Sequence, residues 1–299
     1  MKELIRRLVN KLGYDIVKYN VHSADKATKT VPVKVGNYSI LMPGNNPLIS
    51  LYKYQPDSNI QIAHLAKIVV SKYKDAVMID TGANVGDTAA VVKSQIEIPI
   101  IAIEGDSFSF SFLKKNATQF NDIILLQAFL GEEQKQLSVT MGKDGWNNTI
   151  IPDMNSGKTI DLKTMDNLLQ EENLFTKNIK LLKIDTEGFD TIILRGCRKL
   201  IEQHNPVLFF EYNGENMKSI KEDGYPTLLN LKNYGYHFIH IYDCINNLIL
   251  VTTLDDDNTL KQLDKYARLD NSMIKYYDIC VFHKNDSDLS AQYEKAASK

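Results

Sequence analysis

The sequence contains few cysteines, and none of them belongs to a recognisable motif. Cys197, Cys244 and Cys280 are odd in number, lie far apart and show no Cys-x-x-Cys or Cys/His spacing. This pattern excludes a disulfide framework and a zinc site of the usual spacing, and it is typical of ordinary thiols in a reducing compartment. We therefore expect a cytoplasmic protein.

Long apolar runs and a strong net charge are also absent. No run approaches the roughly 18 apolar residues of a membrane-spanning helix. The formal net charge is -2 and the isoelectric point is about 6.3, which gives no reason to expect a nucleic-acid partner. The 299 residues, 43% hydrophobic and 24% charged, have the composition of a globular protein. The length fits one α/β domain with additions as well as it fits two domains.

The two ends of the chain predict additions to such a domain. Residues 1–20 lack the apolar core of a secretory signal but have an amphipathic helical pattern with basic residues on the polar side. We expect this helix to pack on the domain or on a partner subunit; the alternative is peripheral contact with an anionic membrane at its cytoplasmic face. Residues 285–299 are polar and predict a frayed tail or an exposed helix. The sequence does not indicate an oligomeric state.

The most informative stretch is AVMIDTGANVG at residues 76–86, read together with IIAIEGD at residues 100–106. An apolar run ends in Asp80, and a glycine-rich turn and a helix-compatible run follow. A second apolar run ends in Glu104, 24 residues after Asp80. This order of strand, turn, helix, strand and acidic residue is typical of a Rossmann-like unit that holds a nucleoside-bearing cofactor.

The turn lacks the phosphate-binding pattern G-x-G-x-x-G, because it reads Gly-Ala-Asn-Val-Gly and contains no basic residue. The acidic residue at its entry favours a cationic ligand over a pyrophosphate. S-adenosylmethionine, with its sulfonium and ammonium groups, fits this better than NAD or ATP. We expect Glu104 to accept hydrogen bonds from the ribose hydroxyls. The predicted cofactor-binding residues are Asp80, Thr81, Gly82, Asn84, Gly86, Glu104, Gly105, Gln127, Ala128 and Asp185.

Apolar runs alternate with helical patterns along most of the chain, which predicts a mostly parallel sheet with helices on both faces. We expect an N-terminal helix and turn-rich extension over residues 1–60, a Rossmann-like domain over residues 61–284 and the polar tail. An insertion interrupts this domain at about residues 131–164, and a hairpin is predicted around Asn246 and Asn247. The predicted core strands are Val77–Ile79, Pro99–Ile103, Ile123–Gln127, Ile179–Ile184, Val207–Glu211, Tyr236–Ile241 and Asp278–His283.

A second motif, IKLLKIDTEGFDTIILRG, spans residues 179–196. Lys183, Asp185 and Glu187 occupy alternate positions near the carboxyl end of a central strand, so we expect them to share one face. Charged groups in such a place are costly unless they are paired or functional, and this edge of the sheet forms the ligand crevice. These three residues are therefore the predicted catalytic residues. The alternative for Lys183 is a structural ion pair with a carboxylate.

At these motifs the chain resembles the FkbM-family methyltransferases. The matching pieces, in order, are IDTGANVGDT (79–88), IEGDSFSFSFLKKN (103–116), TMDNLL (164–169), LLKIDTEGFDTIILRG (181–196) and NPVLFFEYN (205–213). The resemblance implies a class I, Rossmann-like fold with a seven-stranded sheet, S-adenosyl-L-methionine as cofactor, and O-methylation of sugars or natural products. It places Asp185 and Glu187 near the methyl group or the acceptor. After the ribose-binding acid the family usually has Pro-Asn, whereas this chain has Gly105 and Asp106.

The expected reaction is methyl transfer to a hydroxyl of a small molecule or glycan, with Asp185 or Glu187 as the base. A Mg²⁺ ion held by Asp185, Glu187 and Glu211 is a less favoured alternative, and no metal ligand is assigned. Aromatic residues in loops 36–60 and 142–158, namely Trp146, Tyr52 and Tyr54, suggest a sugar-binding surface. Other acceptors (an amine, a carboxylate or a lipid), an NAD-dependent oxidoreductase and a non-catalytic binding module remain as alternatives.

Overall fold

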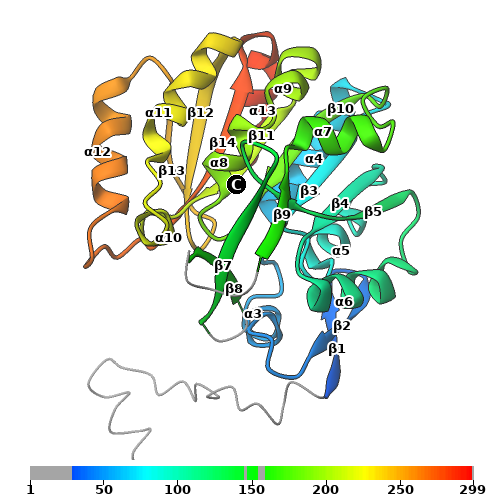
Figure 1. The fold of residues 1–299 in the computed structure, drawn as a ribbon. Helices are drawn as coiled ribbons and strands as arrows, with labels where there is room; N and C mark the ends of the chain where they lie inside the picture. The colour runs from blue at the N-terminus through cyan, green and yellow to red at the C-terminus, as the bar shows by residue number, and fades with distance from the viewer. Residues whose placement is uncertain (1–28, 145–146, 154–158, 298–299) are drawn as a thin grey trace, which may run out of the picture.

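The computed structural model describes residues 29–144, 147–153 and 159–297, which are built around one central sheet (Figure 1). The amphipathic pattern of residues 1–20 and the aromatic residue Trp146 lie outside the described residues. None of the described helices is long and apolar enough to cross a membrane.

The central sheet has eight strands, one more than the seven expected. Its middle strands are parallel, and β14 runs antiparallel between β11 and β12. The additional strand is β13, which forms the predicted hairpin with β12 at one edge. In spatial order the strands are β13 (Leu248–Thr253), β12 (Tyr236–Asp243), β14 (Tyr277–His283), β11 (Val207–Tyr212), β10 (Ile179–Ile184), β3 (Val77–Thr81), β4 (Ile100–Glu104) and β5 (Ile123–Gln127).

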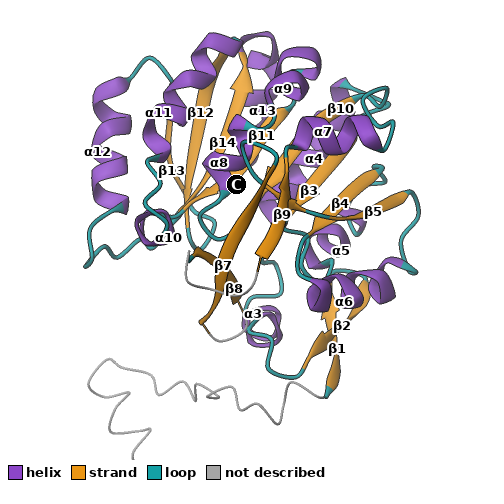
Figure 2. Ribbon diagram, in the orientation of Figure 1, coloured by secondary structure: helices purple, strands orange, loops and turns teal. Residues whose placement is uncertain are grey.

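Helices cover both faces of this sheet (Figure 2) because successive apolar side chains of a strand point to opposite sides. In β4, for example, Ile101 and Ile103 belong to one core cluster while Ile100 and Ala102 belong to the other. The first cluster contains side chains of α7 (Met165–Glu171), α8 (Asp190–Arg195), α9 (Arg198–His204), α11 (Gly224–Asn230) and α12 (Asp257–Ala267). The second contains side chains of α4 (Ile60–Lys72), α5 (Asp87–Lys93), α6 (Ser107–Ala117) and α13 (Ser287–Ala297).

The end of the chain differs from the expected frayed or exposed tail. Helix α13 packs on α4, and its Leu289 and Tyr293 are buried in the second core cluster. The Tyr293 hydroxyl donates a hydrogen bond of 3.2 Å to the backbone carbonyl of Gln61. The two apolar side chains are four residues apart and therefore lie on one face of the helix, although the segment is polar on average.

The turn-rich segment before α4 is packed against the sheet's second core cluster. It contains the hairpin of β1 (Thr30–Val35) and β2 (Tyr38–Pro43), followed by the short helix α3 (Leu48–Tyr54). Val35, Ile40 and Met42 are fully buried in that cluster. The Asn116 amide of α6 joins the hairpin to the glycine-rich turn, because its Nδ2 donates to the carbonyls of Leu41 and Val85 at 2.9 and 2.8 Å.

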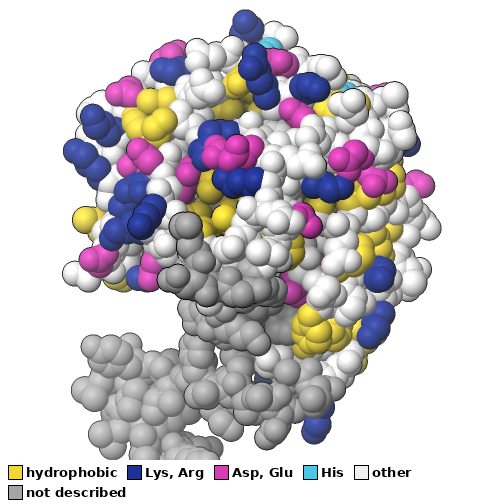
Figure 3. Space-filling model, viewed as in Figure 1, with side chains coloured by type: hydrophobic (Ala, Val, Ile, Leu, Met, Phe, Trp, Pro, Cys, Tyr) yellow, Lys and Arg dark blue, Asp and Glu magenta, His cyan; other side chains and the backbone are white. Residues whose placement is uncertain are grey.

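The predicted insertion forms a second, smaller sheet. Its strands lie in the order β6 (Phe129–Leu130), β9 (Thr159–Lys163), β7 (Lys135–Asp144) and β8 (Asn147–Pro152). The remaining elements are α10 (Gly214–Ser219) and two short 3-10 helices, η1 (Leu231–Tyr234) and η2 (Lys284–Asp286). On the face seen in Figure 3, acidic and basic side chains are interspersed among the described residues. This distribution agrees with the small net charge.

Candidate active site at the carboxyl edge of the sheet

The glycine-rich turn joins β3 to α5 at the carboxyl edge of the sheet. Gly82 and Gly86 have φ angles of 78° and 88°, and Asn84 has a φ angle of 48°, so the turn uses left-handed backbone at three positions. A Cβ atom on Gly82 would lie 1.9 Å from the carbonyl oxygen of Asp185. Gly82 is therefore the point at which the turn after β3 touches the segment after β10.

A buried ion pair crosses the two central strands next to this turn. Asp80 of β3 lies directly opposite Lys183 of β10, and Asp80 Oδ1 is 3.3 Å from Lys183 Nζ. Lys183 Nζ also lies 3.3 Å from Asp185 Oδ2. Asp80 is fully buried and Lys183 is 4% exposed, whereas 48% of the Asp185 side chain is exposed. Among these predicted residues, Asp185 is thus the one whose functional group reaches the solvent side.

The electrostatics of this group depend on a single cation. Burial raises the pKa of Asp80, although the Lys183 ammonium opposes that shift. Burial works against the charged form of Lys183, but the charges of Asp80 and Asp185 outweigh it, so the pKa of Lys183 is raised. Lys183 stays protonated and holds both carboxylates in place. This geometry corresponds to the alternative predicted for Lys183, a structural ion pair with a carboxylate.

Glu104 lies at the end of β4 and closes the other side of the turn. Its Oε2 accepts the backbone N–H of Asn84 at 2.9 Å, and its Oε1 accepts the N–H of Asp106 at 2.7 Å. Burial raises the pKa of Glu104 to about 7, and the two backbone hydrogen bonds oppose the rise. Gln127 of β5 pairs in register with Glu104, so the two strand ends that were predicted to contact the nucleoside are adjacent. The half-buried Ala128 follows directly.

The two residues that depart from the family pattern have clear local roles. Gly105 lies under the ring of Phe129, because a Cβ atom there would be 2.2 Å from a ring carbon. Asp106 caps α6, since its Oδ2 accepts the N–H of Ser109 at 2.9 Å. The short side chain of Asp106 thus provides the cap that an asparagine would also provide.

Glu187 does not follow the alternation that the sequence suggested. Strand β10 ends at Ile184, and Glu187 and Gly188 adopt φ angles of 55° and 99° in the turn that leads to α8. The Glu187 carboxylate accepts a hydrogen bond of 2.8 Å from the Asn216 amide. Lys183 and Asp185 therefore come together as expected, but Glu187 is positioned by a turn and by α10 rather than by the strand.

Two supporting residues were not found from the sequence. Asp190 accepts the backbone N–H groups of Thr186 and Gly188, each at 3.1 Å, and so fixes the turn that carries Glu187. Asp87, the first residue of α5, accepts a hydrogen bond of 2.7 Å from the hydroxyl of Tyr52. Asp190 is the last residue of the pattern DTEGFD. The sequence could have indicated its role, since an acidic residue in the first turn of a helix is a common cap.

The two described aromatic residues of the expected sugar-binding surface differ in exposure. Tyr52 is 3% exposed and its hydroxyl is used by Asp87, so stacking of a sugar on Tyr52, suggested by the sequence, is wrong. Tyr54 is 67% exposed. Trp146 is outside the described residues.

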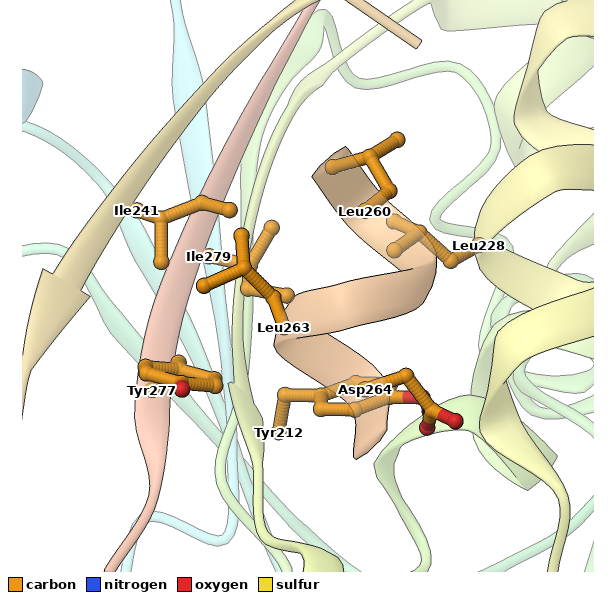
Figure 4. Close-up of a pocket in the computed structure, with 8 residues that line it drawn as sticks. All are labelled: Tyr212, Leu228, Ile241, Leu260, Leu263, Asp264, Tyr277 and Ile279. Carbon is orange, nitrogen blue, oxygen red and sulfur yellow. Dashed lines mark hydrogen bonds between the residues drawn. The ribbon is translucent and has the colours of Figure 1, made fainter. Parts of the chain in front are cut away.

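The described residues contain no group of three or more His, Cys, Asp or Glu side chains arranged to hold a metal ion. The alternative Mg²⁺ site of Asp185, Glu187 and Glu211 is therefore not assembled in these residues. A small cavity lies elsewhere, between α12 and the sheet (Figure 4). Its apolar lining residues belong to the first core cluster or pack against it, and none of the predicted site residues lines it. Its lining is Tyr212, Leu228, Ile241, Leu260, Leu263, Asp264, Tyr277 and Ile279.

The strand order, the glycine-rich turn and the acidic strand ends define a class I, Rossmann-like methyltransferase fold. Residues 48–238 match the family model described as the methyltransferase FkbM domain. This match spans more than half of the chain, and the protein belongs to the FkbM methyltransferase family.

A comparison with the curated proteins finds no match. Among solved structures, the chain is similar to the methyltransferase FkbM from Methylobacillus flagellatus, with 22% identity over 54% of this chain and a TM-score of 0.35. The aligned part is 36% of that chain, little more than a third of its length. It is also similar to the plantazolicin methyltransferase BamL (12% identity, 80% of this chain and 91% of that chain, TM-score 0.42). A third similar structure is the tRNA (uracil-54, C5)-methyltransferase of Pyrococcus abyssi (9% identity, 85% and 44%, TM-score 0.39).

Proposed function

We propose that this methyltransferase uses S-adenosyl-L-methionine to methylate a hydroxyl group of a sugar, a glycan or a glycosylated metabolite. The observation that carries the cofactor assignment is the charge of the site. Asp80, Asp87 and Asp185 surround one buried cation, Lys183, next to a turn without basic residues. Such a site favours a ligand with positive charge and disfavours a pyrophosphate.

The residues present fit this cofactor. A Cβ atom on Gly82 would strike the Asp185 backbone, so a glycine is needed for the turn after β3 to approach the segment that carries Asp185. Glu104 is held at the strand end by two backbone N–H groups and has lone pairs left for the ribose hydroxyls. Gln127 and Ala128 stand beside it, where the base of the nucleoside would lie. The cofactor supplies an activated methyl group on a sulfonium centre.

The chain's own residues then have to orient the acceptor and remove its proton. Asp185 is the first candidate for the base, because its carboxylate is anchored by Lys183 and about half of its side chain is exposed. Glu187 is the second candidate, and Asn216 orients it. Lys183 and Asp80 act as positioning residues behind them. The sugar hydroxyl as acceptor rests on the family, and amine, carboxylate or lipid acceptors are the alternatives.

Calorimetric titration with S-adenosylmethionine, S-adenosylhomocysteine and NAD tests the cofactor assignment. We expect micromolar binding of the first two and none of NAD, with binding lost in Glu104→Ala. The matched control is Glu133→Ala, which removes an exposed carboxylate of the insertion. Absence of binding would leave a non-catalytic module as the better description, and binding of NAD alone would favour an oxidoreductase.

The role of Asp185 has a separate test. Asp185→Asn removes the basic oxygen and keeps the shape, so turnover should be abolished while cofactor affinity stays within about tenfold of the parent. Full activity of this variant would refute the assignment and leave Glu187 as the candidate for the base.

A further inference from the structure

Two carboxylates face each other on β11 and β14, the strands that follow β10 in the sheet. Glu211 of β11 and Asp278 of β14 are directly opposite in the antiparallel ladder, and both are half-buried rather than fully exposed. Like charges in this arrangement destabilise a sheet. The pair lies at the carboxyl edge of β11, one strand away from Asp185, and Glu211 Oε1 accepts a hydrogen bond of 3.2 Å from the Asn213 amide.

The surroundings add further negative charge. Burial raises the pKa of Glu211 well above its usual range, and Asp185, Glu187 and Asp190 raise it further. Burial raises the pKa of Asp278 to about 7, with Asp185 acting in the same direction and Lys183 against it. Lys183 already lies between Asp80 and Asp185, so the pair forms no ion pair of its own among the described residues and keeps its protons to a higher pH than exposed carboxyl groups do.

An independent feature of α4 also indicates a ligand at this place. Gln61 is 7% exposed, and its side chain contacts both Asp278 and the Asn246 side chain of the β12–β13 turn. Gln61 Nε2 donates to Asn246, whereas its Oε1 is buried without a hydrogen-bond partner among the described residues. The side chains of Glu211, Asp278 and Gln61 therefore present more hydrogen-bond acceptors than donors. A protonated amine supplies three hydrogen-bond donors and a positive charge. It would therefore pair with the free acceptors and provide the cation that the two carboxyl groups lack.

We propose that the Glu211–Asp278 pair binds a protonated amine of the acceptor, so that the acceptor is an amine-bearing sugar or metabolite. This inference rests on the proposed function, because it takes the site to be that of methyl transfer. A metal ion is a poorer occupant, since the described residues do not bring three such ligands together. The amine would be held on the β11–β14 side, with the group to be methylated next to Asp185.

Binding of matched sugars to the protein saturated with S-adenosylhomocysteine tests this. The probes are methyl glucosaminide, its N-acetylated form and methyl glucoside, compared by calorimetry at neutral pH. We expect methyl glucosaminide to bind about tenfold more tightly than the other two, which is the effect of one hydrogen bond to a charged group. Equal binding of the three probes, or no binding of methyl glucosaminide, overturns the proposal.

Isosteric variants assign the preference to the pair. Glu211→Gln and Asp278→Asn should each abolish the preference for the amine and leave the affinity for S-adenosylhomocysteine within about threefold. The matched control is Glu215→Gln, an exposed carboxylate of the nearby α10, which should keep the preference. Loss of S-adenosylhomocysteine affinity in the two pair variants would show that the carboxylates serve the cofactor, and so refute the inference. Failure of the parent protein to bind S-adenosylhomocysteine would refute the proposed function itself.

Discussion

Gly82→Ala is the substitution whose effect follows most directly from the structure. The φ angle of 78° at this position disfavours any residue with a Cβ atom, at about 1–2 kcal/mol. The added Cβ would also lie 1.9 Å from the Asp185 carbonyl oxygen and 2.9 Å from its carbonyl carbon. Both atoms are backbone, so no side-chain rotation relieves the contact.

Relief requires the segment after β10 to move away from the turn after β3. The hydrogen bond from the Asp185 N–H to the Thr81 carbonyl, 3.0 Å long, joins these segments and would be weakened at about 0.5–1.5 kcal/mol. The summed destabilisation is about 1.5–3.5 kcal/mol. For a domain of this size it corresponds to a fall in Tm of about 2–6 °C.

The assay is thermal unfolding followed by titration with S-adenosylmethionine. The matched control is Gly131→Ala, whose added Cβ would meet only the Leu162 side chain at 3.1 Å. We expect Gly82→Ala to lower Tm by the amount above and to weaken cofactor binding by at least about tenfold. We expect Gly131→Ala to stay within about 1 kcal/mol of the parent. A Gly82→Ala protein with the parent Tm and the parent affinity would refute the geometry of this turn.

Three further predictions follow from single side chains. The pKa of Glu104 is raised from 4.5 to about 7, so its contribution to folding stability is complete below pH 4.5 and is lost as the pH rises through about 7. Cofactor affinity should rise over that same range as the carboxylate forms, which calorimetry at about pH 5 and about pH 8 checks. Tyr52→Phe leaves the buried carboxylate of Asp87 without its 2.7 Å hydrogen bond and should lower the free energy of unfolding by about 1.5–3 kcal/mol in a denaturant titration, whereas Tyr54→Phe at the exposed neighbour should change nothing. Burial and neighbouring carboxylates raise the pKa of Glu211 well above its usual range, so folding suppresses its ionisation at neutral pH; Glu211→Gln removes that cost and should raise Tm, whereas a lower Tm would show that this carboxyl group stabilises the fold.

The sheet could be predicted from the sequence because its strands are buried on both faces. Near-continuous apolar runs such as those of β3 and β4 leave few alternatives, and the glycine-rich turn marks where the chain must reverse tightly. The same local argument identified Asp80 and Glu104 at the strand ends. The order of the elements then placed these ends at one edge of the sheet.

The predictions that failed depended on contacts between distant parts of the chain or on small local changes of backbone. Tyr52 and Asp87 are 35 residues apart, and nothing in a turn-rich segment tells which of its tyrosines is buried. The last helix differs from the frayed tail or exposed helix that the sequence predicts, because its average polarity hides one buried face. Glu187 was assigned to a strand face, but the backbone leaves the strand after Ile184 and turns left-handed at Glu187 itself.

Acidic residues lie on four neighbouring strands around Asp185, and their order bears on the proposed reaction. Asp80 is on β3, Asp185 follows β10, Glu211 is on β11 and Asp278 is on β14, and these four strands are consecutive neighbours in the sheet. Carboxyl groups among these residues therefore outnumber cations on both sides of Asp185. In the proposed assignment a cationic donor occupies the β3 side and a cationic acceptor the β11–β14 side, so two mutually repelling ligands are held together by carboxylates. Asp185 stands between them, where a proton has to be removed. A methyltransferase for a neutral acceptor would need the first of these acidic groups but not the second, so the Glu211–Asp278 pair is the feature that distinguishes the two substrate classes.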